Sequence, residues 1–212
     1  MKALIIGATG ATGKDLVNVL LQDPDYTEVV AFVRRPGSLN HPNYSEIITD
    51  FEKLEAISDS IKGDVWFSCL GTTLKAAGSR EKQWKVDYDI PAKFAEIAGR
   101  NGVSKAVVVS AYGASAESKM FYSKLKGSLD EHIAGLGFYA CLIFRPGFLL
   151  RKDTDRTSER IIARGLKWSN RLGLLRKFRP LPTSTLAEKL AKAPKVFKSG
   201  RHIIELDEIF GV

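Results

Sequence analysis

The sequence is poor in the residues that build covalently linked or metal-held scaffolds. Among 212 residues it has only two cysteines and three histidines. Cys69 and Cys141 lie inside apolar runs, which predicts buried thiols and excludes a framework of disulfides. The histidines, at positions 41, 132 and 202, are far apart and lack the spacing of metal ligands, so we expect no metal site.

Long hydrophobic runs are also missing. No apolar run approaches the ~18 residues that a membrane-spanning helix needs. The apolar start of the chain is too short for a signal peptide and leads directly into glycines. These absences predict a cytoplasmic protein without a membrane span. The proportions of hydrophobic residues (44%) and charged residues (26%) are those of a globular protein and exclude a disordered or collagen-like chain.

Basic residues are concentrated in the C-terminal third. Residues 1–144 carry 16 basic and 17 acidic side chains, whereas residues 145–201 carry 16 basic and 4 acidic ones. Such a segment can meet nucleic acid, an acidic membrane surface or an anionic ligand, or it can simply be a solvated face. Because the segment contains no recognisable nucleic-acid-binding module, we expect no specific nucleic-acid partner.

Seven short apolar runs alternate with helix-like stretches. Several runs are apolar throughout, as is typical of parallel strands that are buried on both faces. The runs are Ala3–Gly7, Val29–Val33, Ile47–Thr49, Val65–Leu70, Ala106–Ser110, Tyr139–Phe144 and His202–Leu206. The clearest helical stretches between them are Thr12–Gln22, Asp89–Asn101 and Ser118–Leu136. This alternation predicts an α/β fold with a doubly wound parallel sheet and helices on both faces.

The length fits one large core with at most a small appendage. We therefore expect a single domain over residues 1–212, with residues 148–200 forming a small helical substrate or lid segment within it. The last helix of this segment should begin after Pro182, with Thr183 or Ser184 as its cap. The segment's candidates for lining a substrate pocket, or for ordinary packing, are Phe148, Leu149, Leu150 and Trp168.

A glycine cluster follows the first apolar run, in the sequence A-L-I-I-G-A-T-G-A-T-G-K. Gly7 permits a tight turn, Gly10 lets the backbone approach a pyrophosphate, and Gly13 lets the helix pack closely on the strand. The helix N-terminus then offers N–H groups and a positive dipole end to the phosphates. The turn residues predicted to bind a dinucleotide are Gly7, Thr9, Gly10, Ala11, Thr12 and Gly13. The alternative, a glycine-rich turn without a ligand, is disfavoured by this strand–turn–helix context.

Two arginines follow the second apolar run, and no acid is near them. An NAD site usually has an Asp or Glu at this point, whereas an arginine can bind the 2′-phosphate of NADP. Arg34 and Arg35 therefore predict NADP(H), the alternative being that both are exposed loop residues. Asp50 and Phe51, which follow the third run, are candidates for contacts with the adenine ring.

Tyr122 and Lys126 lie four residues apart in F-Y-S-K-L-K-G, within a predicted helix. This spacing places both side chains on one helix face. A lysine ammonium beside a phenol favours the phenolate and lowers its pKa. The tyrosine can then exchange a proton with a carbonyl or alcohol oxygen while a hydride moves to or from a nicotinamide. The alternative is a chance pair of surface residues.

Seven motifs together resemble a known superfamily. They are G-A-T-G-A-T-G, V-R-R, C-L-G-T-T, K-V-D-Y-D, V-V-S-A-Y-G, F-Y-S-K-L-K-G and F-R-P-G-F-L, in this order. With them the chain resembles the short-chain dehydrogenase/reductase superfamily, and most of all its atypical branch, which includes the Tat-interacting protein oxidoreductase group and NmrA-like sensors. The resemblance covers residues 1–150 well. It implies a Rossmann-type fold, binding of NADP(H), and Tyr122 as the acid/base supported by Lys126.

The resemblance also implies roles for residues at the ends of later strands. It places Leu70, Gly71 and Thr72 beside the cofactor's ribose and nicotinamide. It places Pro146 and Gly147 along the nicotinamide pocket. Ser110 stands where the superfamily has a serine that polarises the substrate carbonyl, although the serine here can instead cap the strand. Asp87 lies in the helix-start region where many members carry an asparagine, and a role as a helix cap is equally open.

Two functions follow from these patterns. The first is an NADP(H)-dependent oxidoreductase that acts on a small carbonyl or alcohol, and Tyr122 with Lys126 favours it. The second is a non-catalytic sensor of NADP(H) that regulates a protein partner. The sensor is favoured by Ala111, which stands next to Ser110 where many members carry a second serine.

Overall fold

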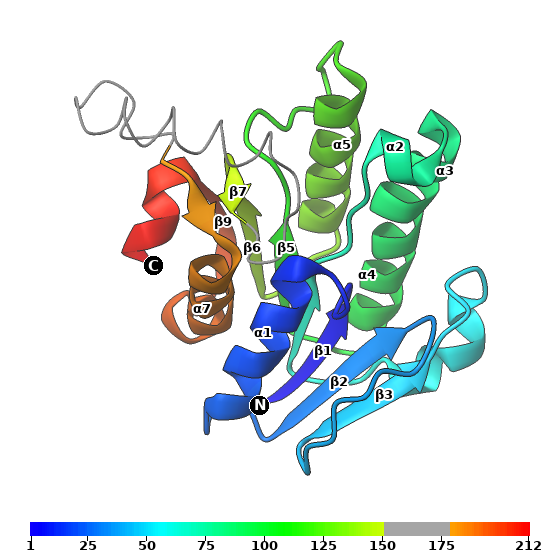
Figure 1. Cartoon of the computed structure of the whole chain (residues 1–212), viewed down its shortest axis with the longest axis vertical. Coiled ribbons are helices and arrows are strands. Elements are labelled where there is room, and N and C mark those ends of the chain that lie inside the picture. Colours follow the sequence, from blue (N-terminus) through cyan, green and yellow to red (C-terminus); the bar gives the residue numbers. More distant parts are fainter. Residues whose placement is uncertain (151–178) are drawn as a thin grey trace.

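A computed structural model describes residues 1–150 and 179–212. Its centre is a parallel sheet with the strand order β3-β2-β1-β4-β5-β6-β9 (Figure 1). The strands are β1 (Lys2–Ile6), β2 (Glu28–Val33), β3 (Tyr44–Ile48), β4 (Val65–Ser68), β5 (Lys105–Val109), β6 (Ala140–Arg145) and β9 (Gly200–Glu205). Every neighbouring pair is parallel. The order reverses between β1 and β4, which confirms the predicted doubly wound α/β sheet.

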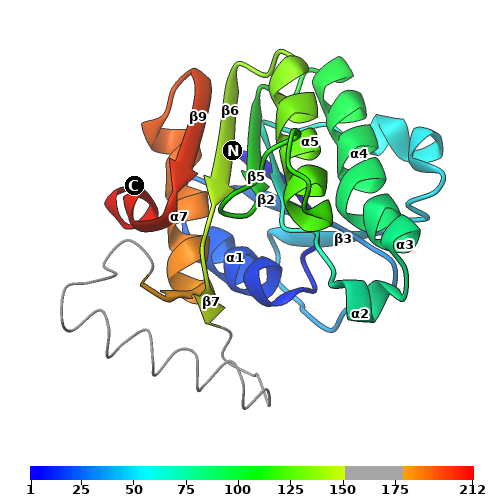
Figure 2. The same cartoon turned by 90° about the horizontal axis from the view of Figure 1, so that it is seen from above.

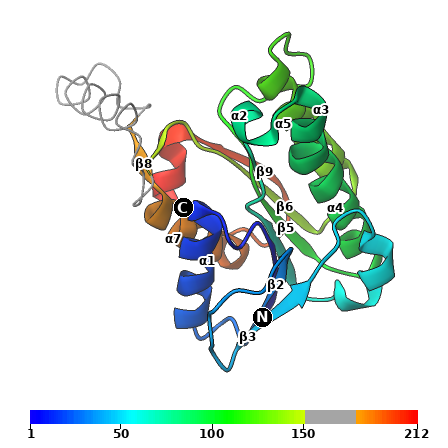
Figure 3. The same ribbon diagram turned by 45° about the vertical axis from the view of Figure 1, so that its right-hand side comes forward.

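Helices cover both faces of this sheet. They are α1 (Ala11–Gln22), α2 (Leu74–Ala77), α3 (Arg80–Trp84), α4 (Ile90–Arg100), α5 (Phe121–Gly135) and α7 (Thr183–Val196). Shorter elements are the 3-10 helices Leu54–Ser60 and Leu206–Gly211, a π-helical turn Lys85–Asp89, and the paired strands β7 (Leu149–Leu150) and β8 (Leu181–Pro182). Figures 2 and 3 show α1 and α7 on one face of the sheet and α4 and α5 on the other.

The core is divided between the two faces because successive strand residues point in opposite directions. In β1, Ala3 and Ile5 pack in one apolar cluster with α1 and α7, whereas Leu4 and Ile6 pack in a second cluster with α4 and α5. All four of these side chains are fully buried. Burial on both faces explains why the central strands appear in the sequence as unbroken apolar runs.

The C-terminal helix α7 is part of this core. The Tyr26 hydroxyl donates a hydrogen bond of 2.6 Å to the Ala191 carbonyl, and the Thr183 hydroxyl donates one of 2.7 Å to Asp15 Oδ2. The helix begins directly after Pro182, as expected, but no side chain caps its N-terminus. Thr183 thus links α7 to α1 instead of capping its own helix. The rest of the predicted lid, residues 151–178, lies outside the described residues.

Candidate functional site

The turn from β1 into α1 is packed so tightly that two positions exclude a side chain. Gly7 has a φ of +81°, and a Cβ built on it would lie 2.5 Å from the Cys69 carbonyl carbon. A Cβ on Gly13 would lie 2.1 Å from the Gly7 carbonyl oxygen. At Gly10 the nearest atom to a Cβ would be that same oxygen, at 3.4 Å. The first and third glycines are therefore required by the backbone's own packing, while the second faces more open space.

The N-terminus of α1 fits an anionic group. Gly10 is the N-cap residue, and no side chain caps the helix. The first N–H groups of a helix have no partners within the helix, and they carry the positive end of its dipole. The first turn of α1 therefore offers free donors to a phosphate where the glycine turn leaves room for one.

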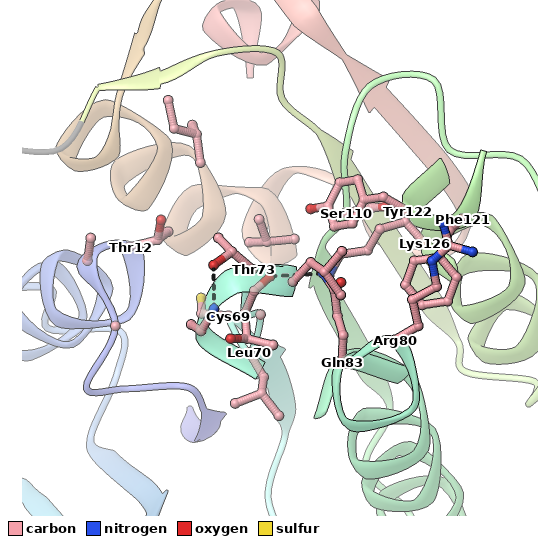
Figure 4. Close-up of a pocket in the computed structure, with 18 residues that line it drawn as sticks. Thr12, Cys69, Leu70, Thr73, Arg80, Gln83, Ser110, Phe121, Tyr122 and Lys126 are labelled. Carbon is pink, nitrogen blue, oxygen red and sulfur yellow. Dashed lines mark hydrogen bonds between the residues drawn. The ribbon is translucent and has the colours of Figure 1, made fainter. Parts of the chain in front are cut away.

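A cavity of about 680 Å³ opens beside this turn (Figure 4). It lies at the carboxyl ends of β1, β4 and β5, where the strand order reverses and where ligands bind in sheets of this kind. Its lining comprises Gly10, Ala11, Thr12, Cys69, Leu70, Gly71, Thr72, Thr73, Leu74, Ala76, Arg80, Gln83, Val109, Ser110, Phe121, Tyr122, Lys126 and Leu149. The fold thus gathers the helix α1 start, the loop after β4, the end of β5 and the first turns of α5 around one space.

The other predicted site residues are not among those that line this cavity. They are Gly7, Thr9, Gly13, Arg34, Arg35, Asp50, Phe51, Pro146 and Gly147. Arg34 and Arg35 are exposed directly after β2, the strand that pairs with β1. Asp50 is exposed after β3. Pro146 is buried after β6, and its carbonyl accepts a hydrogen bond of 3.0 Å from the Tyr112 N–H.

Tyr122 and Lys126 both reach the cavity from one face of α5. Lys126 is buried (3% exposed), whereas Tyr122 is 44% exposed. The helix that carries them lies directly against the preceding loop, because a Cβ on Gly127 would lie 2.2 Å from the Ser115 carbonyl carbon. This close backbone packing fixes the position of both side chains relative to the loop.

Asp87 holds the loop after β4 in place. It is fully buried in the π-helical turn before α4, and its Oδ1 accepts a 2.7 Å hydrogen bond from the Thr72 N–H. Gln83 Nε2 donates one of 3.2 Å to the Thr72 carbonyl, so both backbone groups of Thr72 are held. Asp87 is therefore a support for the cavity's loop and caps no helix. π-Helical turns of this kind occur frequently at functional sites.

The second oxygen of Asp87 and the Lys126 ammonium both lie near Gly71. Asp87 Oδ2 has no hydrogen-bond partner among the described residues. Asp87 Oδ2 and Lys126 Nζ each lie 3.9 Å from the point where a Cβ on Gly71 would stand. Burial raises the pKa of Asp87, and the Lys126 ammonium and the Thr72 N–H oppose that rise. The glycine thus leaves space between a buried carboxyl and a buried ammonium.

Ser110 is held by a buried network that the sequence did not reveal. Its hydroxyl donates a 2.9 Å hydrogen bond to Asp130 Oδ2, which also accepts one of 2.9 Å from Arg145 Nε. Arg145 in turn pairs with Glu205 at 3.0 Å. Asp130 is fully buried, and burial raises its pKa, while the bonds from Ser110 and Arg145 oppose the rise. The hydroxyl proton of Ser110 is directed to Asp130. Toward a ligand the Ser110 oxygen can therefore only accept a hydrogen bond.

The described part of the chain, residues 1–150 and 179–212, lacks two other kinds of feature. It contains no group of three His, Cys, Asp or Glu side chains placed to hold a metal ion. None of its helices combines the length and the apolar character needed to cross a membrane.

Comparison with known proteins gives the family context. The sequence model of the NAD(P)H-binding family matches residues 7–170. The mitochondrial protein FMP52 of Debaryomyces hansenii is 36% identical over 197 residues, which are 91% of this chain and 85% of that protein. The FMP52 protein of Candida albicans is 33% identical over 195 residues, covering 89% and 85% of the two chains. Rat protein HTATIP2 is 35% identical over 150 residues, covering 69% of this chain and 62% of the rat protein.

Solved structures show the same fold. MoeE5 in complex with UDP-glucose and NAD superposes with a TM-score of 0.74 at 18% identity, covering 99% of this chain and 79% of MoeE5. A short-chain dehydrogenase/reductase superfamily protein from Agrobacterium tumefaciens with bound NAD gives 0.71 at 15% identity, covering 97% of this chain and 77% of that chain. The predicted Rossmann-type fold is confirmed.

The predicted cytoplasmic location is wrong. The FMP52 relatives are named as mitochondrial proteins, which points to the mitochondrion. The prediction rested on buried thiols and on the lack of a secretory signal peptide. Those features argue against an oxidising, secretory environment but do not distinguish between the compartments in which thiols stay reduced.

Proposed function

Because the chain belongs to the NAD(P)H-binding family, in the atypical branch of the short-chain dehydrogenase/reductase superfamily, we propose that it is an NADP(H)-dependent oxidoreductase that reduces or oxidises a small carbonyl or alcohol. One observation carries this proposal. Tyr122 and Lys126, one helical turn apart on α5, line the same cavity as the N-terminus of α1 behind its glycine turn. A phosphate-binding helix end and an acid/base pair therefore share one space.

Different groups of residues would bind the different parts of the cofactor. The turn from Gly7 to Gly13 and the first N–H groups of α1 would hold the pyrophosphate. Arg34, with Arg35 beside it, would bind the 2′-phosphate, and the two residues after β3 would flank the adenine. The nicotinamide half would lie between the loop Leu70–Thr72, Lys126 and the two residues after β6. Bound NADP(H) would supply or accept the hydride.

Tyr122 would move the proton. Its hydroxyl would donate a proton to the carbonyl oxygen during reduction and take one from the alcohol during oxidation. The Lys126 ammonium would stabilise the phenolate and hydrogen-bond the nicotinamide ribose. Because Lys126 is buried, water screens its charge little, which strengthens its effect on the phenol. The Ser110 proton is directed to Asp130, so Ser110 would donate no hydrogen bond to a substrate carbonyl, and it would accept one only from the hydroxyl of an alcohol substrate.

The general test is a screen of the purified protein with NADPH against a panel of aldehydes and ketones, followed by loss of NADPH absorbance. We expect at least one small carbonyl to be reduced. NADPH binding without turnover of any carbonyl or alcohol would contradict the oxidoreductase proposal.

The 2′-phosphate should determine whether the protein binds NADPH more tightly than NADH. We expect the wild type to bind NADPH more tightly than NADH, and Arg34→Ala to remove most of the difference. A charged hydrogen bond contributes about 1.5–3 kcal/mol, which is about ten- to a hundredfold in affinity. Calorimetric titration of both proteins with both cofactors measures this. NADH affinity serves as the internal control, since Arg34→Ala should leave it unchanged; equal affinities in the wild type would show that the arginines do not select the cofactor.

Lys126 should matter for both binding and chemistry. We expect Lys126→Ala to weaken NADPH binding by about tenfold or more, because a charged hydrogen bond to the ribose is lost, and also to reduce turnover. Lys124→Ala, which removes an exposed lysine from the same helix, is the matched control. Unchanged NADPH affinity in Lys126→Ala would exclude the lysine from the cofactor site.

A second function, the sensing of NADP(H) for a protein partner, is favoured by the state of Ser110. Its side chain is buried, and its proton is directed to Asp130, so the serine offers no donor to a substrate carbonyl. A sensor would bind NADP(H) through the same turn and arginines but show no turnover. The carbonyl screen separates the two functions.

A further inference from the structure

Arg80 places a positive charge at the tyrosine end of the cavity. It is the first residue of α3, whose N-terminus is capped by Ser79, with the Ser79 hydroxyl oxygen accepting a 3.2 Å hydrogen bond from the Lys82 N–H. The Arg80 guanidinium carbon lies 5.4 Å from the centre of the Phe121 ring, within the range of a cation–π contact. Phe121 directly precedes Tyr122 at the start of α5. The exposed arginine is thus held beside the proposed acid/base.

Within the part of the chain that the structure describes, no carboxylate forms an ion pair with Arg80. The side chains that line the cavity include two cations, Arg80 and Lys126, and no carboxylate among the described residues. An exposed guanidinium at the rim of a cavity, without an ion-pair partner in the described ranges, is suited to bind an anionic ligand group.

The cofactor does not account for Arg80. The phosphate-binding turn is marked by Thr12, which Figure 4 shows across the cavity from Arg80, Phe121 and Tyr122. Arg34 and Arg35, which follow β2, would supply the charge for the 2′-phosphate in the proposed function. Two groups would meet at Tyr122 in the proposed reaction, the nicotinamide with its ribose and the substrate. Because the nicotinamide and its ribose carry no negative charge, only the substrate can bring an anionic group to Arg80.

We propose that Arg80 is a specificity-determining residue that binds an anionic group, a carboxylate or a phosphate, on the carbonyl or alcohol substrate. This inference rests on the proposed oxidoreductase function and narrows its substrate class. The planar guanidinium forms paired hydrogen bonds with either group. The anion at Arg80 would orient the substrate so that its carbonyl oxygen meets Tyr122, and the selection would be for small oxo acids or phosphorylated carbonyls over neutral aldehydes.

The kinetic test uses matched pairs of substrates with NADPH: 4-carboxybenzaldehyde with benzaldehyde, succinic semialdehyde with butanal, and glyceraldehyde 3-phosphate with glyceraldehyde. We expect kcat/KM to favour the anionic member of at least one pair by about tenfold or more, corresponding to about 1.4 kcal/mol. In Arg80→Gln the value for the anionic member should fall to that of its neutral partner. Lys82→Gln removes an exposed cation that does not line the cavity and should keep the preference. The first two pairs test a carboxylate, and the third tests a phosphate.

Binding provides a readout that does not depend on turnover. The protein saturated with NADPH is titrated calorimetrically with succinate and with its neutral diamide. We expect succinate to bind to the wild type and to Lys82→Gln, about tenfold more weakly to Arg80→Gln, and the diamide to bind poorly to all three.

The outcomes separate this inference from the function on which it rests. Equal kcat/KM for anionic and neutral members, or succinate binding that Arg80→Gln leaves unchanged, would overturn the role of Arg80 while the reductase function stands. Succinate binding that depends on Arg80, without turnover of any carbonyl, would support an anion site and contradict the oxidoreductase function.

Discussion

Replacement of Tyr122 with phenylalanine is expected to abolish carbonyl reduction while leaving NADPH binding nearly intact. The change removes one hydroxyl and keeps the ring that fills this part of the cavity wall. Proton transfer by a positioned side chain contributes about 10²–10⁴-fold to rates, so turnover should fall by about that factor. Stopped-flow or steady-state loss of NADPH absorbance measures the rate, and calorimetry measures the affinity.

The matched control for this change is Tyr139→Phe. Tyr139 is 64% exposed and lies between α5 and β6, outside the cavity lining, so this variant should behave as the wild type. Full reductase activity in Tyr122→Phe would show that the tyrosine and lysine are not a catalytic pair. The mechanism proposed for this chain would then have to be abandoned.

The second large effect is expected at Gly13. Glycine within a helix is ordinarily less stable than alanine by about 0.5–1 kcal/mol. In α1 the added methyl group would lie 2.1 Å from the Gly7 carbonyl oxygen and 2.8 Å from Ala8 Cα. The helix would have to move away from the end of β1. Overpacking of this kind costs about 1–3 kcal/mol and sometimes more, so Gly13→Ala should destabilise the fold and weaken NADPH binding.

Urea denaturation of Gly13→Ala and Gly99→Ala would compare the same substitution in two helices. A Cβ on Gly99, in α4, would make an ordinary contact of 3.7 Å with the Phe138 ring. Gly99→Ala should therefore raise the free energy of unfolding by about 0.5–1 kcal/mol, the opposite sign to Gly13→Ala. Wild-type stability in Gly13→Ala would mean that the turn tolerates a side chain and that its glycine has no steric role.

The strands were the most predictable part of the fold. Each of the seven apolar runs overlaps one strand of the parallel sheet, because strands covered by helices on both faces need apolar residues at every position. The place of α7 was not predicted from its sequence. Its amphipathic pattern indicates that one helix face, which includes Leu186 and Leu190, is buried. The pattern does not indicate which other element packs against that face. The structure places these residues in the cluster shared with α1, more than 160 residues away in the chain.

Some residues of the candidate site could also be predicted from the sequence, and others could not. Short-range spacing identifies the glycine turn and the pair Tyr122 and Lys126, because each lies within a single element or turn. The roles of Asp87 and Asp130 depend on contacts with other elements, so local spacing does not show which groups their carboxylates bind. Asp130 does stand four residues after Lys126 on the same helix face, and this spacing was a usable signal for a third polar residue near the site.

Because α7 packs against α1 and β9 pairs with β6, the fold cannot be completed until these two C-terminal segments have been synthesised. The bonds from Tyr26 to Ala191 and from Thr183 to Asp15 join residues 165 and 168 positions apart, and β9 closes the sheet beside β6. Contacts between such distant segments form late and slowly, since a long loop must be closed first. During synthesis on the ribosome, the apolar face of α1 and the edge of β6 therefore stay uncovered until α7 and β9 have emerged. In that interval the unpaired edge and the exposed apolar surface are the parts of the nascent chain that are prone to aggregation.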